Sequence, residues 1–308
     1  MRYDNEFHPR SSKKWQLARA ENFTEWGSQY PDYSKLHKFL EKQHQIPKQY
    51  ICMTNGAEEA VRIVLSYPSL SRLNFVPTWR LAPVFNSLYA KINTQIGVDV
   101  LDDSFDYDMQ TLDKLVHSHQ LIYIASPNAF TGNTIERSII KQFLKHYPES
   151  IFVVDETYYQ FNNYNTVIDL VPKYENLVVI RSYSKAHGLA AHRFGFYATK
   201  NKKFIDIRPA SPCSSETISK VIKSYDNVHK AVSSIKKGKK IIEESLSKKA
   251  KIYRTKANFI VCEFRQDLHD DIMRIADFHT FDINSQKFIK LTALPKELAE
   301  EFVKELNA

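Results

Sequence analysis

The sequence contains little glycine and cysteine and has no long hydrophobic run. Among its 308 residues only seven are glycine and three are cysteine, at positions Cys52, Cys213 and Cys262. Three widely spaced cysteines argue against a disulfide framework and a cysteine-rich metal site, so we expect no metal and a reducing, cytoplasmic location. No apolar stretch approaches the length of a membrane span, and residues 1–6 contain no apolar signal segment, so no membrane partner or secretion signal is expected.

Low-complexity tracts and internal repeats are also absent, which excludes fibrous and solenoid proteins. The net charge is +8, so a nucleic-acid partner has to be considered. The densest basic segments, 236–240 and 248–251, fall in or beside a helix-like stretch and carry almost no aromatic residues for base stacking. We therefore expect a solvated lysine face and no nucleic-acid partner, and the same charge suits acidic or phosphorylated small-molecule substrates.

Apolar runs alternate with amphipathic segments along the first two thirds of the chain. The runs that we expect to form buried strands are residues 74–76, 95–98, 121–125, 151–154, 177–180 and 194–197. Amphipathic helices are expected between several of them, at residues 58–67, 112–117 and 135–147. This alternation predicts an α/β fold with a mainly parallel sheet. Because ligands bind at the carboxyl ends of such strands, Ser126, Asp155 and Ser182 should meet in one crevice.

The character of the sequence changes after about residue 206, where a smaller α+β domain is expected. Its predicted elements are a long, polar, helical segment over 214–246, strands at 256–262 and 287–291, and a final helix over 298–306. The domain organisation that we predict is an N-terminal arm over 1–30, a large domain over 31–205 and a small C-terminal domain over 206–308.

The most informative segment is RSYSKAHGLAAHRFG, residues 181–195. Its lysine, Lys185, follows a strand-like run and has Ser182 and Ser184 just before it, and Arg193 comes eight residues later. A lysine amine can form a Schiff base with an aldehyde. Hydroxyl groups and an arginine fork can hold a phosphate. These properties suit pyridoxal 5′-phosphate (PLP), although a lone Ser-x-x-Lys would more often be a surface turn.

Further motifs in the same chain order support this interpretation. They are YPDY at 30–33, TNGAEEA at 54–60, SPNAFTG at 126–132 and DETYYQF at 155–161. Four of the seven glycines, at 56, 132, 188 and 195, fall inside the motifs, where backbone must approach a ligand or adopt positive φ. From about residue 29 onward the chain resembles the class I and II aminotransferases of PLP fold type I. The closest subgroups in appearance are histidinol-phosphate aminotransferase and threonine-phosphate decarboxylase.

The resemblance implies a role for each motif residue. Lys185 would carry PLP as a Schiff base and move the α-proton, Asp155 would pair with the pyridine nitrogen, and Tyr158 would hydrogen-bond the phenolic oxygen. Trp79 would stack on the cofactor ring. The residues implied for the phosphate are Gly56, Ala57, Glu58, Ser182, Ser184 and Arg193, with the N–H groups at the helix start as donors. Tyr30 would reach the phosphate of a neighbouring subunit, which implies a homodimer with shared active sites.

Some positions depart from the family pattern. The asparagine before Pro-Thr-Gly is Ala129 here, and Asn128, one residue earlier, is the candidate replacement. The arginine that forks the substrate carboxylate corresponds to Lys290, which offers a point charge and no planar fork. A smaller change is Ala191 in the family's Gly-x-Arg approach to Arg193. These departures bear on the identity of the substrate and the efficiency of the reaction more than on the binding of PLP.

Three functions remain open on the sequence. The first is a PLP-dependent aminotransferase that passes an amino group between a small amino acid or amine, phosphorylated or not, and a keto acid. The second is a PLP-dependent decarboxylase of a phosphorylated amino acid. The third is a non-catalytic PLP-fold protein, an alternative suggested by Ala129 and a short C-terminal domain. Retention of Lys185, Asp155, Tyr158 and Arg193 favours an enzyme, and the order of preference is the order given.

Overall fold

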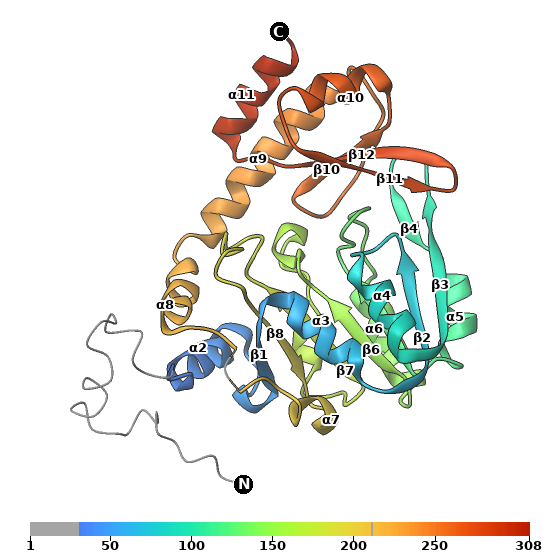
Figure 1. Cartoon of the computed structure of the whole chain (residues 1–308), viewed down its shortest axis with the longest axis vertical. Helices are drawn as coiled ribbons and strands as arrows, with labels where there is room; N and C mark the ends of the chain where they lie inside the picture. The colour runs from blue at the N-terminus through green and yellow to red at the C-terminus, as the bar shows by residue number, and fades with distance from the viewer. Residues whose placement is uncertain (1–30, 211) are drawn as a thin grey trace, which may run out of the picture.

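The computed structural model describes residues 31–210 and 212–308 of the chain. Figure 1 shows a broad sheet with helices packed against it, and a smaller sheet that lies with the C-terminal helices at the other end of the molecule. The long helix α9 (Val228–Leu246) extends from the level of the large sheet to the small one. No helix within the described ranges combines the length and hydropathy needed to cross a bilayer.

The large sheet has eight strands in the order β1-β8-β7-β6-β5-β2-β3-β4. The strands β7, β6, β5, β2 and β3 pair in parallel, whereas β8 is antiparallel to both neighbours and β4 is antiparallel to β3. Their bounds are β1 (Ile51–Asn55), β2 (Ser69–Val76), β3 (Ala90–Val100), β4 (Phe105–Tyr107), β5 (Leu121–Ala125), β6 (Ile151–Asp155), β7 (Leu177–Ser182) and β8 (Phe194–Thr199). The predicted α/β fold with a mainly parallel sheet is confirmed.

Both faces of this sheet are buried, which explains why its strands are continuous apolar runs. On β7, Val178 and Ile180 pack with α3 (Gly56–Ser66) and α4 (Leu81–Tyr89). The alternate residues of β7 pack in the cluster of the opposite face. That face is covered by α2 (Ser34–His44), α5 (Met109–Val116) and α6 (Arg137–His146). Shorter elements complete this part: η1 (Lys48–Tyr50), η2 (Tyr159–Asn162), η3 (Ile168–Leu170) and α7 (Lys202–Ile205).

The small sheet has four antiparallel strands in the order β11-β12-β10-β9. They are β9 (Ile252–Tyr253), β10 (Phe259–Glu263), β11 (Phe278–Ile283) and β12 (Gln286–Thr292), and α10 (Gln266–Met273) and α11 (Lys296–Leu306) accompany them. A third apolar cluster joins α9, α10, α11 and these strands. The predicted α+β character of the C-terminal part agrees with this arrangement, while the exact domain boundaries stay a prediction.

The segment over 214–246 is helical as expected, but it contains a break that the sequence did not indicate. The segment forms two helices, α8 (Ser215–Ser224) and α9, separated by residues 225–227. Asn227 has φ −122° and ψ −9°, which is outside the helical region, and asparagine competes poorly for helix-interior positions because its side chain bonds the local backbone. The break lets α8 pack near α2 while α9 continues toward the small sheet.

Candidate active site

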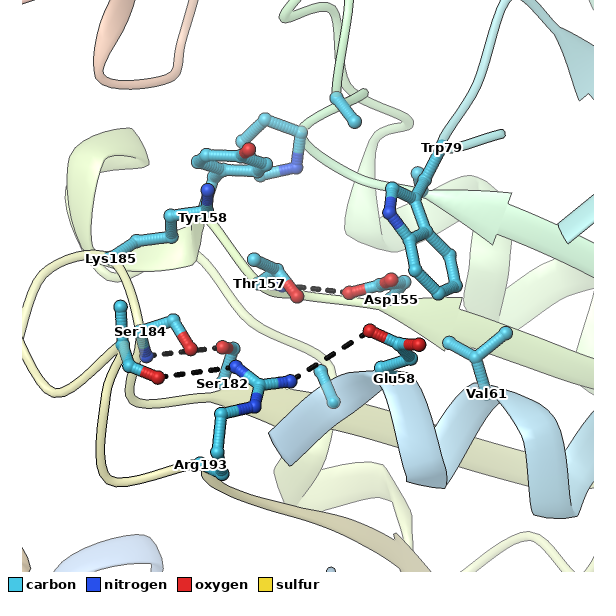
Figure 2. A pocket seen from close by; sticks show the side chains of 15 residues that line it. Glu58, Val61, Trp79, Asp155, Thr157, Tyr158, Ser182, Ser184, Lys185 and Arg193 are labelled. Carbon is cyan, nitrogen blue, oxygen red and sulfur yellow. Dashed lines mark hydrogen bonds and ion pairs between the residues drawn. The ribbon is translucent and has the colours of Figure 1, made fainter. Parts of the chain in front are cut away.

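A cavity of about 270 Å³ opens where the carboxyl ends of β5, β6 and β7 meet the start of α3 (Figure 2). The residues that line it are Ala57, Glu58, Val61, Trp79, Ala125, Pro127, Ala129, Asp155, Thr157, Tyr158, Ser182, Ser184, Lys185, Ala190 and Arg193. The structure therefore brings together nine of the side chains singled out from the sequence, namely Ala57, Glu58, Trp79, Asp155, Tyr158, Ser182, Ser184, Lys185 and Arg193.

The other predicted residues are placed differently. Gly56 is the first residue of α3, is buried, and is not among the lining residues. Asn128 and Lys290 are not among the lining residues. Tyr30 lies outside the described residues, so its predicted contact with a neighbouring subunit stays a prediction. Lining residues that the sequence did not single out include Val61, Thr157 and Ala190.

At one end of the cavity, Gly56, Ala57, Arg193 and Gly195 lie close together around the start of α3 and form a cup. Gly56 has φ +76°, and a Cβ atom there would lie 2.7 Å from Nη2 of Arg193. A Cβ atom on Gly195 would lie 2.6 Å from the backbone nitrogen of Ala57. The glycines therefore let β8 and Arg193 approach the helix start, where first-turn N–H groups have no partner within the helix and favour an anion.

Arg193 and the serines face this cup. The Nη2 atom of Arg193 lies 3.8 Å from the carboxylate of Glu58, and its Nη1 donates to the carbonyl oxygen of Ala190 at 3.3 Å. Figure 2 shows both contacts beside the two serines. The backbone nitrogen of Ser184 donates to the hydroxyl of Ser182 at 3.2 Å. An exposed arginine fork, two hydroxyls and a helix start together form a site suited to a phosphate.

Lys185 extends into the open cavity. Its Nζ lies 5.5 Å from the ring centroid of Tyr158. Burial lowers the pKa of Lys185, the charge of Arg193 lowers it further, and the carboxylate of Asp155 opposes the shift. A lowered pKa leaves more of the amine unprotonated near neutral pH, which is the nucleophilic form that attacks an aldehyde.

Asp155 ends β6 as a buried carboxylate with two protein donors. Its Oδ2 accepts from the hydroxyl of Tyr123 at 2.8 Å, and its Oδ1 accepts from the backbone nitrogen of Thr157 at 2.9 Å. Burial raises the pKa of Asp155, while the hydrogen bonds from Thr157 and Tyr123 oppose that shift. Sequence reasoning missed Tyr123, because alternation relates residues of one strand and does not give the register between β5 and β6.

The loop after β5 uses Asn128 for its own structure. The Nδ2 of Asn128 donates to the carbonyl oxygen of Pro77 at 2.9 Å, and its Oδ1 accepts from the backbone nitrogens of Phe130 and Thr131 at 2.8 and 3.3 Å. The side chain is fully buried and does not line the cavity. Its next neighbour, Ala129, presents a methyl group there instead. The structure therefore does not bring the predicted amide of Asn128 to the cofactor cavity.

Lys290 reaches the same loop from β12. Its Nζ donates to the carbonyl oxygen of Ala129 at 2.6 Å and lies 4.9 and 4.5 Å from the ring centroids of Phe130 and Phe259. Burial lowers the pKa of Lys290 to about 8, and the positive charge of Lys185 adds to this effect. The ammonium group is thus a cation close to the cavity wall that has only carbonyl and aromatic partners in these contacts.

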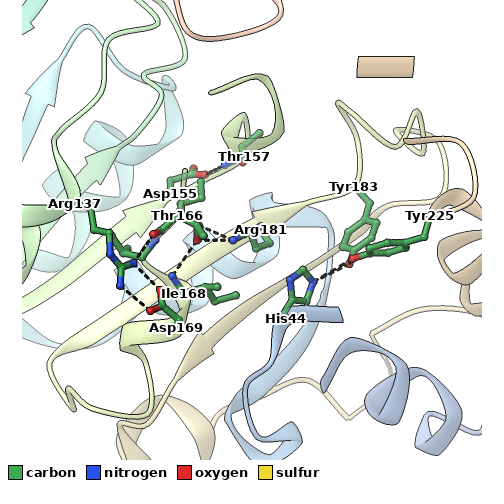
Figure 3. A network of polar contacts seen from close by, with 12 residues as sticks. His44, Arg137, Asp155, Thr157, Thr166, Ile168, Asp169, Arg181, Tyr183 and Tyr225 are labelled. Atoms are coloured by element: carbon green, nitrogen blue, oxygen red, sulfur yellow. Dashed lines mark hydrogen bonds and ion pairs between the residues drawn. The ribbon is translucent and has the colours of Figure 1, made fainter. Parts of the chain in front are cut away.

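A buried ion pair fixes the strand ends that carry the site. Arg181 and Glu156 have side chains 2% and 3% exposed, and Nη2 of Arg181 lies 2.8 Å from Oε2 of Glu156. Thr166 bonds both partners, at 2.7 Å to each (Figure 3). Because Glu156 follows Asp155 and Arg181 precedes Ser182 in the chain, this cluster ties the end of β6 to the end of β7.

A doubly covered α/β sheet with a lysine, a buried aspartate and an anion cup at its strand ends defines a PLP-type site. The chain belongs to the family "Aminotransferase class I and II", whose sequence model matches residues 32–307. It is an enzyme of that family, an aminotransferase with pyridoxal 5′-phosphate as its cofactor. The chemistry of the cavity fits this cofactor, since it offers an amine for the aldehyde, a carboxylate for the ring nitrogen and a cup for the phosphate.

Several known proteins are similar to the chain. Histidinol-phosphate aminotransferase from Thermoanaerobacter pseudethanolicus is 30% identical over 250 residues, which cover 77% of this chain and 70% of the relative. Histidinol-phosphate aminotransferase 2 from Haemophilus influenzae is 28% identical over 285 residues, covering 86% and 76%.

Solved structures agree on the fold. The histidinol-phosphate aminotransferase from Clostridium acetobutylicum has a TM-score of 0.80 at 20% identity, covering 99% of this chain and 97% of that one. The L-threonine-O-3-phosphate decarboxylase from Porphyromonas gingivalis has a TM-score of 0.74 at 16% identity, covering 96% of each chain. An aminotransferase and a decarboxylase thus share this fold, so the fold alone does not separate the two reactions.

Proposed function

We propose that the chain transfers an amino group between a small anionic amino acid or amine and a keto acid, and that its substrate carries a phosphate. The observation that carries the proposal is the meeting of Lys185, Asp155 and Arg193 in one cavity, with Asp155 at the end of β6 and the other two in the connection between β7 and β8. When bound, PLP supplies an electron sink for charge that develops at the substrate α-carbon. The remaining steps fall to the side chains of this chain.

Lys185 is proposed to do two things. Its amine would hold the cofactor by condensing with the aldehyde, with loss of water, and as a free amine it would take a proton from the substrate α-carbon and deliver it at the cofactor carbon. The lowered pKa of Lys185 suits both steps, because each requires the unprotonated amine. Lys185 lines the cavity, so its amine can reach a molecule that is bound there.

Asp155 and Tyr158 are proposed to set the electronic state of the cofactor. A carboxylate on the ring nitrogen keeps that nitrogen protonated, and a phenol at the phenolic oxygen orients the ring. Trp79, which lies across the cavity from Lys185 in Figure 2, is proposed to stack on the ring. Ala57, Glu58, Ser182, Ser184 and Arg193 are proposed to hold the phosphate, with Gly56 permitting the approach.

Lys290 is proposed to attract the substrate carboxylate. Lysine offers a point charge in place of the planar fork of an arginine. It would therefore favour negatively charged substrates but would orient the carboxylate less strictly. A phosphorylated substrate is supported by the net charge of +8 and by relatives named for histidinol phosphate. Asn128 was predicted as a cofactor ligand, but its amide is engaged in the loop, so we do not assign it a cofactor contact.

The setting of the enzyme is also a proposal. We propose a homodimer in which Tyr30 of one subunit completes the phosphate site of the other. We also propose a cytoplasmic location, since all three cysteines are free, as expected in a reducing compartment. The division into an arm over 1–30, a PLP-binding domain over 31–205 and a small domain over 206–308 is proposed on the change of sheet and helix pattern near residue 206.

The experiment follows the near-visible absorbance of the protein with added PLP, with Lys185→Ala as the control variant. A Lys185-dependent band that amino donors convert to the amino form of the cofactor, and that a keto acid restores, is the expected result. Release of carbon dioxide from a phosphorylated amino acid without keto-acid dependence would instead establish a decarboxylase. The absence of any Lys185-dependent band would refute the roles proposed for Lys185 and for the residues around it.

A further inference from the structure

We propose that Tyr123 is a positioning residue, whose hydroxyl holds the Asp155 carboxylate ionised and in place so that the cofactor nitrogen keeps its proton. This inference rests on the proposed function, because it assigns Asp155 to the ring nitrogen. Tyr123 does not line the cavity and belongs to none of the motifs described above.

Strand register puts the two side chains within reach. In the parallel pair of β5 and β6, Tyr123 lies opposite Val153 and Ala125 lies opposite Asp155. Tyr123, Ala125 and Val153 share the apolar cluster on the α3 face of the sheet, so alternation directs Asp155 to that face as well. Two residues along a strand span roughly 7 Å, and a tyrosine is long enough to cover that step while a shorter side chain is not. The result is the 2.8 Å contact from the Tyr123 hydroxyl to Oδ2 of Asp155.

Burial makes the contact important to both partners. Tyr123 is 1% exposed and Asp155 is 7% exposed, so bulk water reaches neither polar group freely. A buried carboxylate oxygen that loses its donor, or a buried hydroxyl that loses its acceptor, is left with an unsatisfied polar atom. Thr157 serves the other oxygen, Oδ1, through its backbone nitrogen. The carboxylate is thus held at both ends by donors from the protein.

The groups around Asp155 keep the Tyr123 hydroxyl protonated, so it can donate its hydrogen bond at any working pH. Burial and the neighbouring carboxylate raise the pKa of Tyr123 well above its usual value, so it stays protonated at working pH. Tyr107 from β4 and Tyr158 after β6 are also buried phenols whose pKa is raised. The charge of Lys185 acts to lower the pKa of Asp155. Removing the Tyr123 hydroxyl therefore increases the proton affinity of Asp155, and the shared proton then moves from the ring nitrogen to the carboxylate.

The test uses Tyr123→Phe in the full chain, loaded with PLP that carries ¹⁵N in its pyridine ring. The matched control is Tyr197→Phe, because Tyr197 is another fully buried tyrosine of the same cluster and donates to the carbonyl oxygen of Phe204 at 2.7 Å. The expected result is a ¹⁵N chemical shift that moves toward unprotonated pyridine in Tyr123→Phe only. Loss of a hydrogen bond to a charged group predicts a fall in kcat of about tenfold to a hundredfold, with a much smaller change in KM.

Two further measurements make the test decisive. In an Asp155→Asn background, Tyr123→Phe should add little, since the hydroxyl acts through the carboxylate. If Tyr123→Phe does not fold, 4-fluorophenylalanine introduced at position 123 fills more of the space of the hydroxyl without donating a hydrogen bond, and it should move the ¹⁵N signal in the same direction. An unchanged ¹⁵N shift in folded Tyr123→Phe, or in the 4-fluorophenylalanine protein, would overturn the inference. The ¹⁵N signal does not require turnover, so a wild-type protein that binds PLP without transaminating would refute the proposed function and still test Tyr123.

Discussion

Replacement of Gly195 by alanine tests the close fit on which the proposed phosphate cup depends. An added Cβ would lie 2.6 Å from the nitrogen of Ala57, 2.7 Å from the carbonyl oxygen of Arg181 and 2.7 Å from the carbonyl carbon of Gly56. All three atoms belong to backbone, so no flexible side chain can rotate away. Relief requires β8 and the start of α3 to separate by several tenths of an ångström.

The cost of such overpacking is about 1–3 kcal/mol. If the protein relieves it by moving the helix start, the N–H groups that are proposed to face the phosphate move with it. A loss of about 1.4 kcal/mol corresponds to a tenfold change in affinity, so Gly195→Ala should weaken PLP binding by roughly 5- to 100-fold. The free energy of unfolding of the cofactor-free protein should decrease by about 1–3 kcal/mol, which is the cost of the overpacking.

The assay is fluorescence titration of PLP together with denaturant unfolding of the cofactor-free protein. Gly97→Ala is the matched control, because a Cβ there meets nothing within 4 Å and the position has no positive φ. That control should bind PLP as the wild type does and keep or slightly gain stability. If Gly195→Ala binds PLP as tightly as Gly97→Ala, the close approach of β8 to α3 is not what shapes the cup.

Other variants test the remaining parts of the site. Arg193→Ala should weaken PLP about tenfold to a hundredfold in the same titration, through loss of a charged hydrogen-bonding fork, and an unchanged dissociation constant would remove Arg193 from the cup. Because the pKa of Lys290 is about 8, its charge is present below that pH, so KM for a carboxylate substrate should rise as pH increases through 8. Lys290→Arg should abolish that rise, and a KM profile identical to wild type would show that residue 290 does not bind the substrate. Arg181→Met should lower the free energy of unfolding by about 3–5 kcal/mol, because it leaves the buried Glu156 carboxylate without its cation; a loss under 1 kcal/mol in denaturant titration would contradict this.

Local patterns in the sequence were sufficient to predict the buried strands and the residues at their ends. The apolar runs at 121–125, 151–154 and 177–180 each became a strand of the central sheet. Strand termini follow the sequence directly, so Asp155 and Ser182 could be assigned to one edge before any contact was known. The edge strand β1 and the break between α8 and α9 were not predicted, since short apolar runs and single polar residues carry weak local signals.

Side-chain partners within the site could not be predicted in the same way. Asn128 was expected to face the cofactor, but the turn that it stabilises requires both ends of its amide. The bond between Lys290 and Ala129 joins residues 161 positions apart. Such contacts depend on how the small sheet is placed against the loop after β5, and no local pattern records that placement.

The sequence by itself was sufficient to predict the α/β pattern from its apolar runs, and the order of its motifs carries the resemblance that indicated the class of the protein. Only the tertiary structure decided which donors hold the Asp155 carboxylate, which loop occupies Asn128 and where Lys290 is directed. The physical reason is that periodicity records whether a face is buried, whereas the partner of a buried polar group is set by strand order and register across the sheet.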